Sequence, residues 1–176
     1  VYCRTDSHWS GRGLQVVTRR IAEKLREQGW TREPAKDWTV TAREVSIQGD
    51  LARLAGLADR ETVKLEVVAD GAGAPITPDP ASPIVLLGDS HTLVFQAGGD
   101  MHATGAGLAD HLSREIGRAV DLLGVRGSGA TTSRISLMRR VRADAQYLPG
   151  KFAVVWCFAA RDFTEADGWR KVPLLP

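Results

Sequence analysis

The fold is decided by IVLLGDS at residues 84–90, a short apolar run followed by a glycine, an acid and a serine. An unbroken apolar run of this length is typical of a central parallel strand covered on both faces. In open α/β sheets, functional sites lie at the carboxyl ends of the strands. The pattern therefore predicts that Ser90 lies at such an end, where Gly88 lets the backbone turn sharply.

The elements around this run alternate between helix and strand. Downstream we expect a helix over 105–117, a strand over 119–125, a helix over 132–143 and a final buried strand over 152–158. Upstream we expect a helix over 12–28 between Ser10 and Gly29, strands over 38–47 and 62–68, and a short helix over 51–57. The order from residue 84 onward implies right-handed crossovers. The predicted fold class is α/β, a three-layer sandwich with a mostly parallel, flavodoxin-like central sheet.

The composition is that of one ordinary globular domain. The chain has 176 residues, of which 43% are apolar and 25% charged, so we expect a single domain over 1–176. The net charge of +2 gives no support for a nucleic-acid partner or an anionic membrane. No stretch approaches the roughly 20 apolar residues of a membrane span. The chain opens directly into a candidate catalytic segment, which predicts that it is truncated at its N-terminus.

Cysteine and histidine usage gives no sign of a metal site. Cys3 and Cys157 permit one disulfide at most, and their apolar surroundings favour two buried thiols. Two cysteines and four scattered histidines do not form a metal-ligand pattern, so we expect no metal. No glycine-rich phosphate-binding motif follows a strand, which disfavours a nucleotide-binding protein of flavodoxin type.

Asp6, His8 and Ser90 together supply the groups that nucleophilic catalysis by a hydroxyl requires. A serine hydroxyl needs an adjacent base, which in turn needs a third group to hold its tautomer. Asp6 and His8 are two residues apart, so their side chains lie on one side of an extended segment, and Trp9 is placed to shield them. The alternative is a helix-entry turn in which Asp6 caps locally and His8 is a surface residue.

The glycine-rich turn at residues 127–129 offers backbone N–H groups to an oxyanion. It follows the strand that comes next after the serine strand. Such donors each contribute roughly 3 kcal/mol to stabilising a transition state. The N–H groups of Ser90, Gly127 and Gly129 are therefore the candidate oxyanion-hole donors, and the alternative is an ordinary strand-to-helix loop.

The other histidines are weaker candidates for the base. His91 adjoins Ser90 in sequence, and neighbouring side chains point apart, so His91 is poorly placed to be the base and is instead expected to line the pocket. His102 lies in a glycine-rich loop and is expected to be exposed. Asp110 and His111 are adjacent on one helix, do not face each other, and are assigned to solvent.

Two segments, YCRTDSHW at residues 2–9 and GDSHT at 88–92, resemble the SGNH-hydrolase-like domain of the alginate O-acetyltransferases, the AlgX/AlgJ group. Residues 126–134 resemble the glycine-rich segment of that group, and residues 152–156 resemble its last core strand. The Asp-x-His segment precedes the serine, the reverse of ordinary SGNH esterases, and Trp follows His directly. This order is the most specific part of the resemblance, which extends in order over most of the chain.

The resemblance implies acetyl transfer through a serine ester, with Ser90 as nucleophile, His8 as base and Asp6 holding the imidazolium. It implies a polysaccharide acceptor, an acetyl donor supplied by a membrane-bound export partner, and a periplasmic or extracytoplasmic location. No metal, nucleotide or other cofactor is required. Trp9, His91 and Arg161 are the candidate substrate-binding residues, although Arg161 is also suited to a surface ion pair with Asp162 or Glu165.

The chain departs from ordinary SGNH esterases in one respect that bears on mechanism. It contains no asparagine, so the asparagine donor of their oxyanion hole has no counterpart. Backbone N–H groups must then carry more of that stabilisation.

Two further functions stay open: a carbohydrate acetylesterase with the same triad, and a non-catalytic α/β module that binds glycans. The four arginines of the predicted last long helix are assigned to a solvated face: Arg134, Arg139, Arg140 and Arg142.

Overall fold

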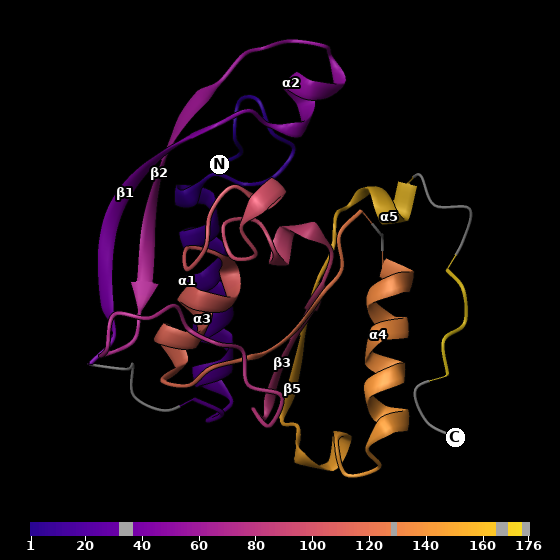
Figure 1. Cartoon of the computed structure of the whole chain (residues 1–176). Coiled ribbons are helices and arrows are strands. Elements are labelled where there is room, and N and C mark those ends of the chain that lie inside the picture. The colour runs from indigo at the N-terminus through magenta and orange to yellow at the C-terminus, as the bar shows by residue number, and fades with distance from the viewer. Residues whose placement is uncertain (32–36, 128–129, 165–168, 174–176) are drawn as a thin grey trace.

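A three-stranded parallel sheet forms the centre of the molecule (Figure 1). The structure is a computed structural model, which describes residues 1–31, 37–127, 130–164 and 169–173. The strand order of the sheet is β4-β3-β5, where β3 is Ile84–Gly88, β4 is Asp121–Gly124 and β5 is Ala153–Cys157. All five residues of β3 are buried. The predicted central parallel strand is therefore confirmed, and so is the α/β class.

Helices cover both faces of this sheet. Helices α1 (Gly11–Glu27) and α3 (Leu108–Ile116) pack on one face, and α4 (Ala130–Ala143) packs on the other (Figure 1). The pleat of β3 divides its side chains accordingly, because Ile84 and Leu86 join the core with α1 and α3 while Val85 and Leu87 join the core with α4. Ser10 caps α1 by accepting the Gly13 N–H at 3.3 Å, as predicted.

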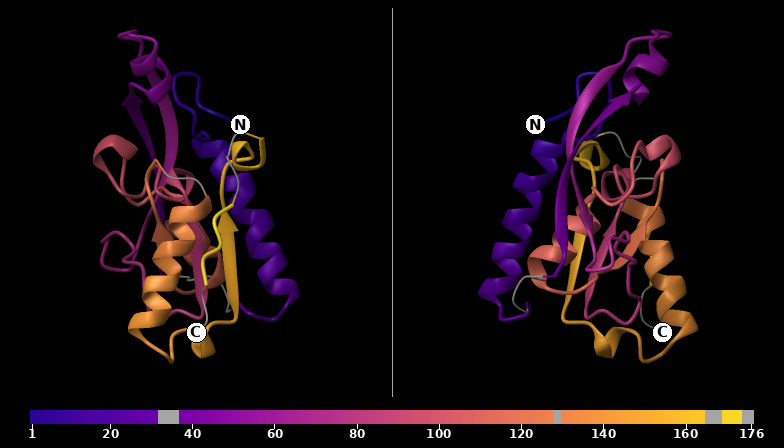
Figure 2. Two further views of the ribbon diagram at one scale, coloured as in Figure 1. Left: turned by 90° about the vertical axis from the view of Figure 1, so that its right-hand side faces the viewer. Right: turned by 60° about the vertical axis from the view of Figure 1, so that its left-hand side comes forward.

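A two-stranded hairpin forms an additional layer outside α1 and α3 (Figure 2). Strand β1 (Thr39–Ile47) pairs antiparallel with β2 (Glu61–Ala69), and α2 (Asp50–Leu54) lies at the tip between them. The sequence predicted both strands but not that they form a sheet of their own. Strand β2 packs on the helices through Val63, Leu65 and Val68, whereas β1 is exposed along most of its length and joins the same core mainly through Ile47.

Strand β5 corrects the prediction of a final buried strand. It lies at the edge of the sheet, so one side of it has no neighbouring strand among the described residues. Phe152, just before it, is 59% exposed, and Val154 is 44% exposed. The apolar composition of this stretch indicated a strand but not its position in the sheet.

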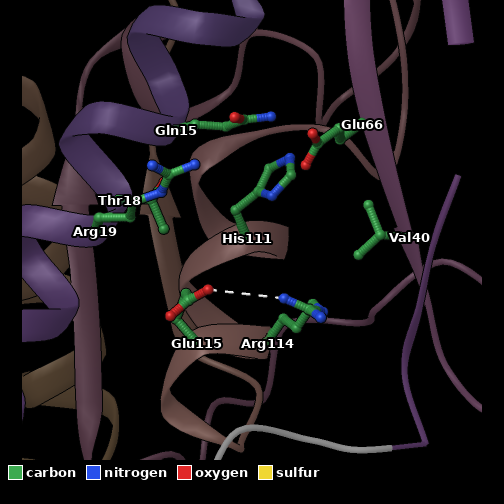
Figure 3. A pocket seen from close by; sticks show the side chains of 8 residues that line it. All are labelled: Gln15, Thr18, Arg19, Val40, Glu66, His111, Arg114 and Glu115. Carbon is green, nitrogen blue, oxygen red and sulfur yellow. Dashed lines mark ion pairs between the residues drawn. The ribbon is translucent and has the colours of Figure 1, made fainter. Parts of the chain in front are cut away.

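Asp110 and His111 are buried, which corrects their assignment to solvent. Helix α3 is covered by α1 on one side and by β2 on the other, so little of its surface remains free (Figure 3). Asp110 is 2% exposed, and its carboxylate accepts the Gly107 N–H at 2.9 Å, at the start of the helix. Burial raises the pKa of Asp110 to about 7, and burial likewise lowers the pKa of His111.

The arginines of α4 are only partly solvated, which corrects another assignment. Arg139 and Arg142 are exposed. The Arg134 guanidinium, however, lies over the rings of Trp156 and Trp169, at 5.6 and 5.3 Å from their centroids. Arg140 pairs at 3.7 Å with Asp121, a buried carboxylate. Among the described residues, no helix is long and apolar enough to cross a membrane.

Candidate active site

The structure brings Asp6, His8 and Ser90 into one line of hydrogen bonds. Ser90 follows β3 and opens a short 3-10 helix over Ser90–Thr92, and its Oγ lies 2.7 Å from His8 Nε2. His8 Nδ1 lies 2.5 Å from Asp6 Oδ1. Asp6 and His8 are buried, whereas Ser90 is half-buried. A hydroxyl, an imidazole and a carboxylate in this order form the arrangement that activates a serine nucleophile.

The segment that carries Asp6 and His8 is a tight turn, not the extended stretch that the sequence predicted. Asp6 Oδ1 accepts the backbone N–H of His8 at 3.0 Å, as aspartate does in local turns. Cys3 N–H donates to the His8 carbonyl at 3.1 Å and closes the loop. The same carboxylate oxygen therefore fixes both the backbone and the ring of His8, which explains how residues so close in sequence can interact.

Two acidic side chains of the hairpin layer hold this turn in place. Glu61 accepts the Thr5 N–H at 2.6 Å and the Thr5 hydroxyl at 2.7 Å. Asp50 accepts the Ser7 N–H at 2.7 Å and the Ser7 hydroxyl at 2.5 Å. We call Glu61 and Asp50 the polar clamp. The sequence analysis singled out neither residue, because each lies more than 40 positions away from the turn it holds.

Close contact between the tip of the hairpin and the turn depends on Gly49. A Cβ at this position would lie 2.0 Å from the carbonyl oxygen of Thr5, far inside van der Waals contact. The absence of a side chain lets the start of α2 approach the turn, so that Asp50 N–H donates to Asp6 Oδ2 at 3.1 Å. The hairpin thereby contributes a donor directly to the candidate triad.

Asp6 is held ionised within this environment. Burial alone raises the pKa of Asp6, but hydrogen bonds from His102 and His8 outweigh burial and hold the pKa well below its usual range. The carboxylate therefore carries a negative charge at neutral pH. Such a charge orients the imidazole and stabilises the imidazolium that forms when His8 takes a proton.

His102 contacts the site, which corrects the expectation that it is exposed. Its side chain is 7% exposed, and its Nε2 lies 2.8 Å from Asp6 Oδ2. His102 is 96 positions away from Asp6 in the sequence, within a glycine-rich loop that has no hydrophobic periodicity. Nothing in the local sequence pattern could have placed it there.

His91 lies beside His8, without taking the place of the base. The two rings are 4.9 Å apart, and the Trp9 ring meets His91 edge-on at 5.2 Å. His91 Nδ1 lies 3.1 Å from Asp89 Oδ1, and the same oxygen accepts the His91 N–H at 2.9 Å. His91 and Trp9 line a cavity of about 430 Å³ that also contacts Phe158. Both residues therefore lie where a substrate group can bind.

A second cavity, of about 340 Å³, contains the triad itself. Its positively charged residues are Arg53, Arg126 and Arg161, of which Arg161 also lines the first cavity. Gly127, with φ of 61°, lines the triad cavity as well. Gly129 lies outside the described residues. Of the predicted oxyanion donors, Ser90 and Gly127 are thus brought to one cavity.

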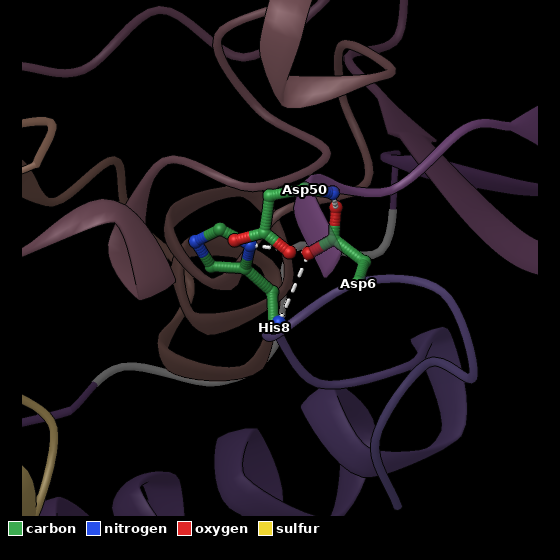
Figure 4. A group of neighbouring side chains, drawn as sticks. All are labelled: Asp6, His8 and Asp50. Atoms are coloured by element: carbon green, nitrogen blue, oxygen red, sulfur yellow. Dashed lines mark hydrogen bonds and ion pairs between the residues drawn. The ribbon is translucent and has the colours of Figure 1, made fainter. Parts of the chain in front are cut away.

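Asp6, His8 and Asp50 are also close enough to be considered as metal ligands (Figure 4). One donor atom from each lies within 4.8 Å of the other two. These atoms are already engaged, however: Asp50 bonds both polar groups of Ser7, and Asp6 bonds His8 and His102. The arrangement is that of a satisfied hydrogen-bond network.

The two cysteines are free thiols that flank the site; Cys3 is buried as expected, whereas Cys157 is only half-buried. Burial, with a contribution from the Glu61 charge, raises the pKa of Cys3 to about 12. Burial and the Asp89 charge raise the pKa of Cys157 to about 12 as well. Both side chains are therefore uncharged thiols at neutral pH, and neither is an activated nucleophile.

Comparison with known proteins adds a family and a fold. A family model described as the SGNH hydrolase-like domain of the acetyltransferase AlgX matches residues 1–160. The solved O-acetyltransferase domain of Pseudomonas putida AlgJ is similar, with a TM-score of 0.67 and 19% identity over 96% of this chain and 56% of that chain. For Pseudomonas aeruginosa AlgX the TM-score is 0.61 and the identity 18%, over 89% of this chain and 35% of that chain. No curated protein matches.

Proposed function

This chain belongs to the family of SGNH-hydrolase-like domains of the acetyltransferase AlgX, and from that premise we propose that it is a serine-dependent O-acetyltransferase. In this proposal the acetyl group passes through an ester on Ser90 to a hydroxyl of an exported, alginate-like polysaccharide. The observation that carries the proposal is the 2.7 Å contact between His8 Nε2 and Ser90 Oγ, backed by an ionised Asp6. That contact is within the reach needed for direct proton transfer.

The first half of the reaction forms the acetyl-serine. Ser90 Oγ attacks the carbonyl carbon of the acetyl donor and gives its proton to His8 Nε2. The resulting oxyanion accepts hydrogen bonds from the backbone N–H groups of Ser90 and Gly127, with Gly129 as the third candidate donor. His8 then returns the proton to the departing group of the donor, and the ester remains on Ser90.

The second half transfers the acetyl group to the acceptor. A sugar hydroxyl gives its proton to His8 Nε2 and attacks the acetyl carbon of the ester. The tetrahedral intermediate collapses, Ser90 Oγ leaves and takes the proton back from His8, and the O-acetylated sugar departs. Asp6 stays ionised throughout and stabilises each imidazolium state of His8.

The surroundings of the triad support an anionic acceptor. Arg53, Arg126 and Arg161 line its cavity together with Asp6, Asp50 and Asp100, and Arg126 pairs with Asp100 at 3.1 Å. Arg161, which lines both cavities, is therefore the guanidinium best suited to bind an acceptor carboxylate through two parallel hydrogen bonds. Trp9 and His91 line the adjoining cavity, with room for further sugar. We further propose a membrane-bound export protein as the source of acetyl groups, and a periplasmic site of action. No cofactor enters the scheme.

The test is acetyl release from p-nitrophenyl acetate by the purified chain, with and without polysaccharide acceptors. Ser90→Ala and His8→Ala should lose the activity and the acetylated-protein mass, while Ser136→Ala on α4 should keep both. Transfer to an acceptor that outpaces release would favour the transferase. Release that no acceptor accelerates would favour an acetylesterase, and activity that survives in both site variants would overturn the serine mechanism.

A further inference from the structure

We propose that His102 is a positioning residue of the active site, which holds the Asp6 carboxylate in the orientation that serves His8. The two carboxylate oxygens of Asp6 have different hydrogen-bond partners. Oδ1 bonds the ring and the backbone of His8. Oδ2 bonds His102 Nε2 at 2.8 Å and the Asp50 N–H at 3.1 Å. This inference rests on the proposed serine mechanism, because His102 acts only through Asp6.

The protonation of this pair follows from the charge on Asp6. An ionised carboxylate only accepts hydrogen bonds, so the His102 nitrogen that faces it must carry a proton. A neutral His102 therefore has its proton on Nε2, whereas a neutral His8 has its proton on Nδ1. The two imidazoles thus donate to different oxygens of one carboxylate, and of the two rings only His8 also contacts Ser90.

The backbone at His102 adds an independent observation. Its φ of 72° and ψ of −39° fall in a region that residues with a Cβ seldom adopt. Ala103 N–H donates to the Met101 carbonyl at 2.9 Å, which closes a three-residue turn centred on His102. Turns of this handedness are rare and strained. Such strain persists only where surrounding structure over-determines it, and it concentrates at functional sites.

The surrounding loop supplies that constraint. Phe95 N–H donates to the Met101 carbonyl at 2.8 Å, and Gly98 N–H donates to the Ala103 carbonyl at 2.9 Å. The Phe95 ring lies 6.1 Å from the His102 ring. Phe95, with φ of 61°, shares the positive φ of His102. The loop therefore holds two residues in unfavourable backbone conformations, and at His102 the result is that a buried imidazole donates to Asp6.

The position of this donor explains what its loss would do. Without His102, Oδ2 keeps only the Asp50 N–H, and the carboxylate gains freedom to rotate away from His8. Small misplacements of catalytic groups cost up to roughly 100-fold in rate. Substrate binding does not involve this bond, so the loss should appear in kcat and not in KM.

The first experiment measures the rate at which a fluorophosphonate labels Ser90, together with kcat and KM for p-nitrophenyl acetate. His102→Ala should slow labelling and lower kcat by roughly 10- to 100-fold with KM unchanged. His102→Gln, which keeps an N–H donor, should recover part of the loss. Thr104→Ala, exposed on the same loop, is the control and should match the parent. Labelling of His102→Ala at the parental rate would overturn the proposal.

Folding of the variants is checked by His102→Gly. Glycine adopts the positive φ of this turn without strain, so this variant should fold and still label as slowly as His102→Ala. If His102→Gly labels like the parent, the imidazole has no positioning role. If the parent itself is not labelled, the proposed function fails instead, and the second experiment decides on His102.

The second experiment is nitrogen NMR of the histidine rings in the parent and in His102→Gln. In the parent, His102 should carry its proton on Nε2, and the Nδ1 proton of His8 should give a sharp, strongly downfield signal. Loss of the His102 ring should shift or broaden that signal. A parental His102 with Nε2 unprotonated, or a His8 signal that is identical in both proteins, would refute the inference without reference to activity.

Discussion

The two halves of the candidate site are built in opposite ways. Ser90 stands at the end of β3, whose side chains are all buried between helical layers. Asp6 and His8 stand in an irregular turn, which side chains of a separate hairpin hold from outside. We call these the sheet half and the clamp half. One is held by apolar burial and the other by directed hydrogen bonds.

The difference matters because the two kinds of support fail differently. Apolar burial is non-directional and scales with area, so damage to the sheet half should lower stability first. Hydrogen bonds fix position, and a lost acceptor leaves a buried donor unsatisfied. Damage to the clamp half should therefore lower activity more than stability. The following variants are ordered by the size of the effect we expect.

Leu86→Ala should have the largest effect and should act on stability. Leu86 is fully buried in β3, and truncation of a buried leucine to alanine costs about 2–5 kcal/mol of the free energy of unfolding. Molecules that remain folded should release acetyl groups at close to the parental rate. Thermal unfolding monitored by circular dichroism, with activity per folded molecule, checks this. A variant with parental stability but little activity would contradict the view that β3 supports the site through stability alone.

Asp110→Asn should have the next largest effect and should change how the free energy of unfolding depends on pH. The pKa of Asp110 in the folded chain is raised to about 7, above its unfolded value, so the native carboxyl destabilises the fold increasingly as pH rises from about 4 to 7. Asparagine does not titrate and keeps an oxygen for the Gly107 N–H. Since the pKa rises from 3.8 to about 7, the variant should gain roughly 4 kcal/mol over the parent at pH 8. Urea unfolding at pH 5 and pH 8 tests the sign, and an equal difference at both would contradict it.

Glu61→Gln should have a smaller effect on stability and a clear effect on activity. One carboxylate oxygen of Glu61 accepts the N–H and hydroxyl of Thr5, and the other accepts the Arg4 N–H at 2.9 Å. The amide replaces one of these acceptors with a donor, so in either orientation at least one backbone N–H of the turn loses its partner. We expect a loss of about 1 kcal/mol in unfolding free energy. We expect kcat to fall roughly 10-fold as the turn shifts. Steady-state kinetics and thermal unfolding measure the two effects. A fall in stability without a fall in kcat would contradict a positioning role for Glu61.

Glu44→Gln should have the smallest effect and serves as the matched control. Glu44 lies on the same hairpin, in an exposed pair 3.8 Å from Lys64. Exposed ion pairs contribute about 0–1 kcal/mol. Both kcat and the unfolding temperature should stay near parental values. A large loss here would mean that any change to the hairpin disturbs the site, so that Glu61 would lose its special role.

The same contrast determines what the sequence could reveal. The buried run before Ser90, the helix and strand periodicity and the cap at Ser10 all follow from local pattern, so the sheet half was predictable. The order of Asp6, His8 and Trp9 before the serine indicated the triad chemistry by resemblance. The segment from Asp6 to His8 was predicted as extended, with a turn capped locally by Asp6 and a surface His8 as the alternative. The structure has the local cap of the alternative, but His8 is buried in the site, and no periodic signal could decide between the two.

The residues that sequence reasoning missed act through long-range polar contacts. Glu61 and Asp50 look like ordinary surface acids of a hairpin, and His102 looks like part of an exposed loop. Each contacts the 5–8 turn only because the hairpin and a glycine-rich loop fold over it. Asp110 was misassigned for a related reason, since a fourth layer covers the face of α3 that a three-layer fold would leave open.

The two free thiols allow the two halves to be compared by their rates of reaction with a thiol reagent. Cys3 donates its N–H to the His8 carbonyl in the clamp half, and the Cys157 carbonyl accepts the Asp89 N–H in the sheet half. Cys3 is buried, so a thiol reagent reaches it only while the clamp half is open. Cys157 is half-buried and lines the cavity of Trp9 and His91, so its reaction with the same reagent reports access to that cavity. Mass spectrometry of the two trapped thiols therefore separates opening of the turn from access to the cavity in a single sample of the parent protein.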